Sequence, residues 1–103
     1  MNDGACGAQH ATVYVAKCYW PGITEAELER VAATAVREAD AASRSGSRVA
    51  YLGTILFPDD DLVLCLFQGD SRVAVKQTNE RAGIPCERLM ESILLTRPTP
   101  ITS

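Results

Sequence analysis

Histidine is scarce in this sequence, and its cysteines are widely separated. The four cysteines, Cys6, Cys18, Cys65 and Cys86, form no Cys-x-x-Cys pair, so a zinc site built from them is not expected. The one histidine, His10, lies at the start of the first predicted strand, where we expect it to be solvated. Haem-handling and metal-dependent enzymes of this general shape use an internal imidazole, which this chain lacks.

Long apolar runs, basic patches and nucleotide motifs are also missing. No apolar run reaches the roughly 18 residues needed to cross a bilayer. The first residues lack the segments of a signal peptide, so we expect a cytoplasmic protein with reduced cysteines that pack as small hydrophobic residues. The net charge is −3, with 13 acidic and 10 basic residues scattered along the chain, so nucleic acid is not an expected partner. No serine is placed for triad chemistry, and no glycine-rich phosphate loop precedes a helix.

The length and composition of the chain are those of one globular domain. The chain has 103 residues, of which 47% are hydrophobic and 22% charged. Residues 1–11 are mostly small and polar and are expected to form a flexible arm. Residues 12–95 carry the patterns of a folded domain, and residues 96–103 form a tail rich in proline and threonine.

The clearest local signal is a helix that begins after Thr24. Glu27, three residues later, completes a reciprocal capping box, and Ile23 and Leu28 occupy the positions of a hydrophobic staple. Apolar residues then recur at steps of three and four, and the polar stretch 43–47 ends the helix. The expected inward face consists of Leu28, Val31, Ala32, Ala35, Ala39 and Ala42.

Four runs of β-branched, aliphatic and aromatic residues predict strands. Residues 12–20 end at a Pro-Gly turn, and residues 86–95 form the last run. Between them, residues 48–57 and 62–68 flank the acidic stretch 58–61, which indicates a hairpin. The three aspartates of that turn lack the ligand spacing of a calcium loop, so we interpret them as a solvated turn.

A second helix is expected between the third and fourth strands. Asp70 or Ser71 caps its start, and the sequence Gly83-Ile84-Pro85 marks its end, because glycine suits the left-handed position after a helix and proline cannot continue it. Its expected inward face consists of Ala74, Val75, Thr78 and Ala82.

The element order β-α-β-β-α-β predicts a ferredoxin-like α+β fold. Right-handed crossovers would place both helices on one face of a four-stranded antiparallel sheet. Along each strand, apolar residues that face the helices should then alternate with polar residues that face water. The two hairpin strands are instead apolar on both sides. Leu62, Leu64 and Leu66 oppose Val63, Cys65 and Phe67, while Tyr51, Ile55 and Phe57 oppose Leu52 and Leu56.

An apolar face of this size would exceed the patches usual on monomers. We therefore expect a homodimer formed through the sheet face opposite the helices, which would make a dimeric α+β barrel. A different protein partner remains an alternative.

Four residues are candidates for a ligand site on that face. They are Lys17 and Tyr19 on the first strand, Tyr51 on the second and Gln68 on the third. Polar groups on an otherwise apolar, covered surface are typical of a small-molecule pocket. The alternative is that Lys17 and Gln68 lie near strand ends and reach water.

Three short runs carry a resemblance to a known family. Residues 19–25 (YWPGITE), 65–69 (CLFQG) and 82–85 (AGIP) resemble an actinobacterial ferredoxin-like family of unknown function that includes a nickel-binding protein. The resemblance implies a dimeric ferredoxin-like fold, with metal or small-ligand binding. Lys17 stands where the family usually carries glutamate, Cys18 where arginine is common, and Gln68 where a second glutamate is usual, while Cys65 matches. Because these exchanges remove the negative charge that a cation needs, we expect no metal cofactor here.

Four functions remain open at this level. The first is a dimeric binding module that encloses a small, partly apolar ligand, with Lys17 and Gln68 as polar anchors. The second is a nickel or other divalent-metal protein, as the family resemblance implies. The third is a cofactor-independent enzyme with Lys17 as acid or base, and the fourth is a purely structural partner.

Overall fold

The computed structural model describes the backbone of residues 9–96 and the side chains of residues 12–95. The predicted flexible arm and tail fall largely outside this range, as does Cys6. The described elements are β1 (Gln9–Tyr19), α1 (Glu25–Arg44), β2 (Val49–Phe57), the short helix η1 (Pro58–Asp60), β3 (Leu62–Gly69), α2 (Arg72–Arg81) and β4 (Arg88–Thr96).

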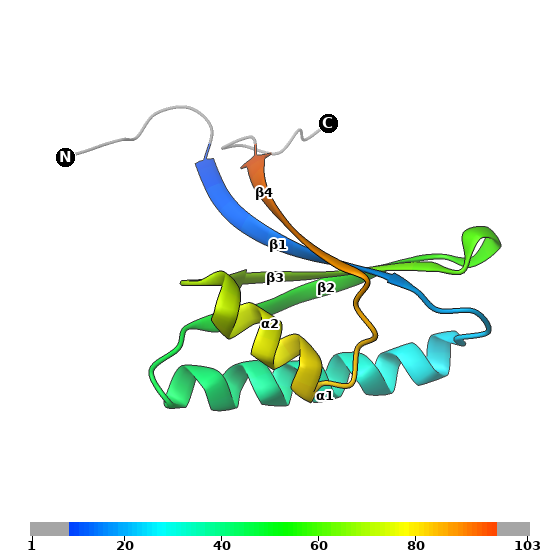
Figure 1. Cartoon of the computed structure of the whole chain (residues 1–103), viewed down its shortest axis with the longest axis horizontal. Coiled ribbons are helices and arrows are strands. Elements are labelled where there is room, and N and C mark those ends of the chain that lie inside the picture. Colours follow the sequence, from blue (N-terminus) through cyan, green and yellow to red (C-terminus); the bar gives the residue numbers. More distant parts are fainter. Residues whose placement is uncertain (1–8, 97–103) are drawn as a thin grey trace, which may run out of the picture.

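These elements form a four-stranded antiparallel sheet with both helices on one face (Figure 1). The strand order is β2-β3-β1-β4, and each neighbouring pair is antiparallel. α1 packs mainly against β2, whereas α2 contacts β3 and β1. The predicted ferredoxin-like α+β fold is therefore confirmed.

The core lies between this sheet and the helices. Phe67, Val63 and Cys65 of β3 are fully buried, and Cys18 of β1 lies beside them. Hydrogen bonding to Cys65, together with burial, raises the pKa of the Cys18 thiol, so Cys18 stays neutral and packs as an apolar side chain. The helices contribute mostly alanines to this core. Their buried residues include Leu28, Ala35, Ala39 and Ala42 of α1 and Ala74 and Val75 of α2.

Both helices begin where local hydrogen bonding predicts. The Glu27 N–H donates to Thr24 Oγ1 at 3.1 Å, and the Thr24 N–H donates to Glu27 Oε1 at 3.0 Å, which completes the capping box. Ser71, rather than Asp70, caps α2, because its hydroxyl accepts the Ala74 N–H at 3.1 Å. Neither helix in the described part of the chain is both long and apolar enough to cross a membrane.

β1 and β4 extend further than their composition indicated. β1 begins at Gln9 rather than at residue 12, because Gln9 pairs with Thr96 at the end of β4. Residues 9–12 and 93–96 pair only with each other and curve away from the sheet (Figure 1), and we call this segment the β1–β4 arm. His10 lies in the arm, but its side chain is outside the described residues.

A β-bulge changes the side of the sheet to which the later residues of β2 point. Tyr51 pairs with Phe67 while Gly53 pairs with Leu66, so Leu52 is an extra residue in the strand. Gly53 has φ 152°, a conformation that side chains rarely allow. Because of this extra residue, Thr54 and Leu56 lie on the same side as Tyr51, and Ile55 and Phe57 lie on the other. The prediction that Tyr51 shares a face with Ile55 and Phe57 is therefore wrong.

Candidate binding surface on the open sheet face

The sheet face away from the helices carries mostly apolar side chains, and we call it the open face. Directly paired residues in an antiparallel sheet point to the same side, so the register assigns its members. They are Val15, Lys17 and Tyr19 of β1, Ile55 and Phe57 of β2, Leu62, Leu64, Leu66 and Gln68 of β3, and Arg88 and Met90 of β4.

Several large apolar side chains on this face lie in contact with solvent in the single chain. Tyr19 is 56% exposed, Ile55 45% and Phe57 38%. The β1–β4 arm adds Leu94, which pairs with Ala11 on the same side as Met90 and Arg88 and is 48% exposed. Together these residues form the extended apolar surface that the strand sequences predict.

Two cations lie side by side within this apolar surface. Lys17 of β1 pairs directly with Arg88 of β4, and on its other side it faces Leu64 of β3. Like charges on directly opposed residues raise the free energy of a sheet. Tyr19 lies two residues further along the same face of β1, so an aromatic ring flanks the cation pair.

Gln68 shares the open face with Lys17 but lies far from it. Leu64 is opposite Lys17, and Gln68 follows four residues later on β3, roughly 13 Å along the strand. Gln68 instead lines a cavity of about 580 Å³ with Thr12 and Arg48. The structure therefore does not bring the two predicted anchors together.

Tyr51 lies on the opposite side of the sheet from Lys17, Tyr19 and Gln68. Its hydroxyl forms a hydrogen bond with Thr54 Oγ1, which in turn donates to Cys65 Sγ at 3.6 Å. Its ring packs edge-on against Phe67, with centroids 5.6 Å apart, and burial raises the pKa of its phenol. The prediction that Tyr51 belongs to the same surface is wrong because the bulge at Leu52 and Gly53 reverses the facing of the rest of β2.

Comparison with known proteins agrees with this fold. The model of the nickel responsive protein SCO4226-like family matches residues 14–91. The chain belongs to this family. The resemblance drawn from the three short sequence runs is thereby confirmed.

A solved structure superposes on this SCO4226-like chain. The crystal structure of SCO4226 from Streptomyces coelicolor A3(2) is 24% identical in sequence and superposes with a TM-score of 0.55. The match covers 92% of this chain and 100% of that one, so it supports the fold over nearly the whole domain. Curated proteins give no match to this chain.

The donor groups of this SCO4226-like chain can be surveyed over side chains 12–95. Within that range, no three His, Cys, Asp or Glu residues gather closely enough to hold a metal ion. Cys18 and Cys65 are neighbouring buried thiols, and Cys86 is partly buried. On the open face, the charged residues opposite each other are Lys17 and Arg88, which would repel a cation.

Sequence reasoning missed Arg88 as a member of this surface. Its place depends on the register between β1 and β4, two strands separated by about 70 residues of chain. The only local signal was a basic residue near the start of the last apolar run.

Proposed function

We propose that this chain is a homodimeric binding protein whose paired open faces hold a small, partly apolar acid beside Lys17 and Arg88. The observation that carries the proposal is the pair of cations at directly opposed positions within an exposed apolar sheet surface. An exposed apolar surface is stabilised when another protein covers it, and two adjacent cations are stabilised when an anion binds between them.

A second copy of the chain suits the apolar part of this surface. Two sheets that pack face to face lie about 10 Å apart, so side chains such as Leu64 and Ile55 would fill the space between them. A two-fold interface uses the same surface on both partners, so each exposed Tyr19 and Phe57 would be covered by the same contact. A small domain also gains stability from additional apolar burial.

A small acid suits the charged part of the surface. Pairing of the open faces would move Lys17 and Arg88 out of water, and buried like charges are costly unless an anion compensates them. A carboxylate between the two side chains would provide that compensation. The apolar part of the acid would lie against Leu64 and Tyr19, which flank Lys17 on the same face.

Nickel binding, which the family name suggests, is the alternative that we disfavour for this chain. Nickel is held by imidazole, thiolate and carboxylate ligands. Lys17 and Gln68 stand where the resembling family usually carries carboxylates, and neither replaces a negative charge. The side chains at the open face therefore do not fit a divalent cation, although they fit an anion.

The dimer is tested with two variants that differ in location but not in exposure. Ile55 on the open face and Val36 on α1 are both 45% exposed. We expect the wild type and Val36→Glu to scatter light as dimers at micromolar concentration, and Ile55→Glu to dissociate toward monomer. A wild type that is a stable monomer would refute the dimer, as would equal effects of the two variants.

The ligand site is tested at Lys17, with Arg37 of α1 as the matched cation elsewhere. Thermal shifts with a library of small apolar carboxylic acids are compared for the wild type, Lys17→Met and Arg37→Met. We expect acids that stabilise the wild type to lose their effect in Lys17→Met and to keep it in Arg37→Met, which changes an exposed cation away from the open face. If no acid shifts the wild type more than Lys17→Met, Lys17 is not a ligand contact.

A further inference from the structure

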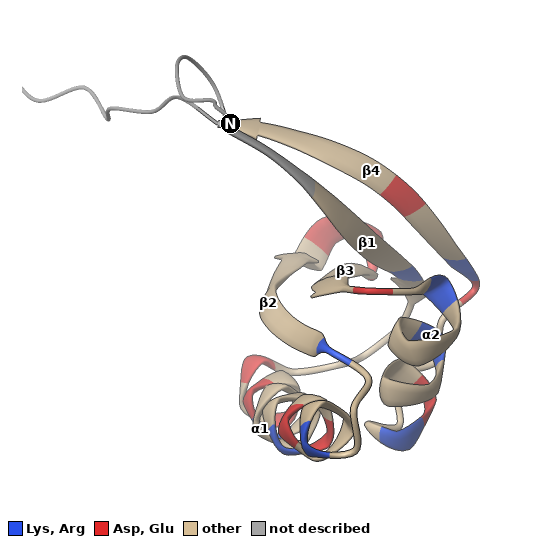
Figure 2. Cartoon of the chain, turned by 90° about the vertical axis from the view of Figure 1, so that its left-hand side faces the viewer, with Lys and Arg blue, Asp and Glu red and all other residues tan. Residues whose placement is uncertain are grey.

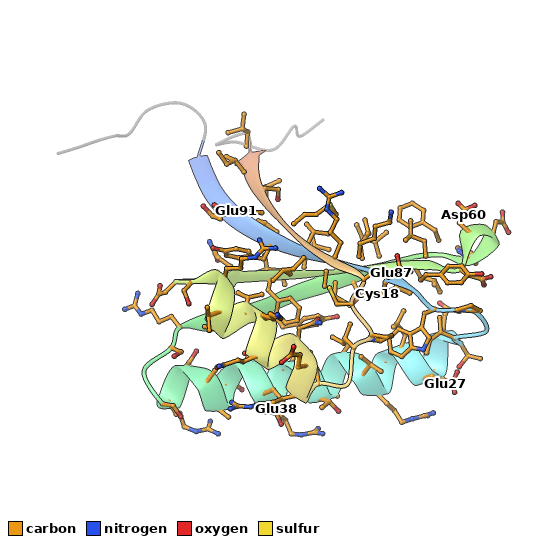
Figure 3. All side chains as sticks on the ribbon, viewed as in Figure 1. Cys18, Glu27, Glu38, Asp60, Glu87 and Glu91 are labelled. Carbon is orange, nitrogen blue, oxygen red and sulfur yellow. The ribbon has the colours of Figure 1, made fainter. Side chains whose placement is uncertain are left out.

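A second cavity lies on the other side of β4, between this edge strand and α2. Its volume is about 500 Å³, within the range of small-molecule sites. α2 contributes Arg72, Lys76, Asn79 and Glu80 to its walls, and Glu87 and Arg88 lie on the β4 side. Figure 2 shows the basic residues of α2 next to the basic start of β4, and Figure 3 labels Glu87 just before that strand.

Asn79 is the unusual residue of this cavity, because it is a polar side chain that is only 2% exposed. Its Nδ2 donates to the Ile84 carbonyl oxygen at 3.4 Å, but its Oδ1 has no hydrogen-bond partner among the described residues. Buried amide oxygens are almost always paired. The Asn79 oxygen therefore calls for an N–H or O–H donor from beyond the described residues.

Two cations lie on the same side of α2 as this acceptor. Arg72, Lys76 and Asn79 follow one another at steps of four and three residues, so they share one face of the helix. The Arg72 guanidinium donates through Nη2 to the Leu89 carbonyl oxygen, which holds it against β4 and leaves other N–H groups free to bind an anion. Lys76 and Asn79 are separated by about 4.5 Å along the helix axis, a span that one small molecule covers.

We propose that this α2–β4 cavity binds a small amino acid. Its carboxylate would accept hydrogen bonds from Arg72 and Lys76, and its ammonium group would donate to Asn79 Oδ1. Glu80 and Glu87 line the same cavity and favour a cationic amino group there. Three cations against two carboxylates suit a zwitterion or a monoanion better than a phosphate dianion. Arg88 lines this cavity as well as the open face, but the contacts proposed here are made by Arg72, Lys76 and Asn79, so this proposal does not depend on the function proposed above.

The first test is a titration of the full chain followed by amide chemical shifts. The L-amino acids are added one at a time, and propionate and ethylamine serve as probes that carry only one of the two charged groups. We expect at least one amino acid to move the amides of α2 and of residues 84–89, and to bind at least about tenfold more tightly than either probe. The proposal is refuted if no amino acid moves these amides, or if propionate binds equally well.

The second test assigns the contacts with matched variants. Lys76→Gln should weaken binding of that amino acid by about tenfold, whereas Arg37→Gln, which removes an exposed cation of α1 outside this cavity and outside the open face, should leave it unchanged. Asn79→Leu should remove the preference for the amino acid over propionate. Equal effects of Lys76→Gln and Arg37→Gln would overturn the proposal even if Asn79→Leu does not fold. A preference that survives in folded Asn79→Leu would show that the ammonium group does not bind Asn79 Oδ1, which also overturns the proposal.

Discussion

Gly69, the last residue of β3, has no room for a side chain. A Cβ atom at this position would lie 2.7 Å from Val75 Cγ2 and 3.1 Å from the Arg48 carbonyl oxygen. Carbon atoms in favourable contact are about 3.5–4.0 Å apart, so the Val75 methyl group would have to move by about 1 Å. Val75 is fully buried on α2, and valine in a helix strongly prefers one rotamer, so its side chain cannot turn away. We expect Gly69→Ala to lower the free energy of unfolding by about 1–3 kcal/mol.

Val75→Ala provides the matched control, because it removes the methyl group that the new Cβ would meet. Alone it deletes two buried methyl groups and should cost about 2–3 kcal/mol. In the double variant the clash with α2 is gone, so the combined cost should fall at least about 1 kcal/mol below the sum of the two. Urea unfolding followed by circular dichroism, at one fixed protein concentration, measures all three variants. Strictly additive costs, or a neutral Gly69→Ala, would refute this steric explanation.

Three further predictions concern the first helix and nickel. Thr24→Ala should cost about 1 kcal/mol in urea unfolding, and an unchanged midpoint would argue against the cap. The backbone and side-chain hydrogen bonds from Thr24 lower the pKa of Glu27 below its usual 4.5, so the stability that they provide is present at neutral pH and disappears as the pH falls through the lowered value. The wild type and Glu27→Gln should therefore converge in stability at low pH, and a constant difference would contradict this account. Calorimetric titration of tag-free protein with Ni²⁺ should show weak or no binding, whereas tight stoichiometric binding that survives His10→Ala would prove this expectation wrong.

The fold could be predicted because its signals are local. The capping box at Thr24 and Glu27 specifies the start of α1 through side chains three residues apart. Gly83, with φ 77°, ends α2 at a position where the left-handed conformation favours glycine. Given two helices and four strands in this order, the right-handed crossover rule leaves few arrangements, and the observed one is among them.

The candidate sites depended on information that is not local. A single extra residue in β2 reversed the facing of Tyr51 relative to Ile55, and the sequence marks the bulge only by Gly53. Arg88 became a neighbour of Lys17 through pairing between the first and last strands. Asn79 was absent from the predicted inward face of α2, because an asparagine on a helix is usually exposed, yet it is buried beside the α2–β4 cavity.

The Lys17–Arg88 pair can be tested by its effect on stability. A glutamate at the Lys17 position would face Arg88 as an opposite charge instead of a like one. Lys17→Glu should therefore stabilise the fold by about 0.2–1 kcal/mol relative to Lys17→Met at low salt, and high salt should reduce this gain. The same change should abolish binding of small carboxylic acids, because it removes one of the two cations. If Lys17→Glu is no more stable than Lys17→Met, the two side chains do not interact as the register implies, and the anion site would lose its basis. A gain in stability together with loss of acid binding would mean that this chain tolerates an unfavourable charge pair at a position that serves a ligand.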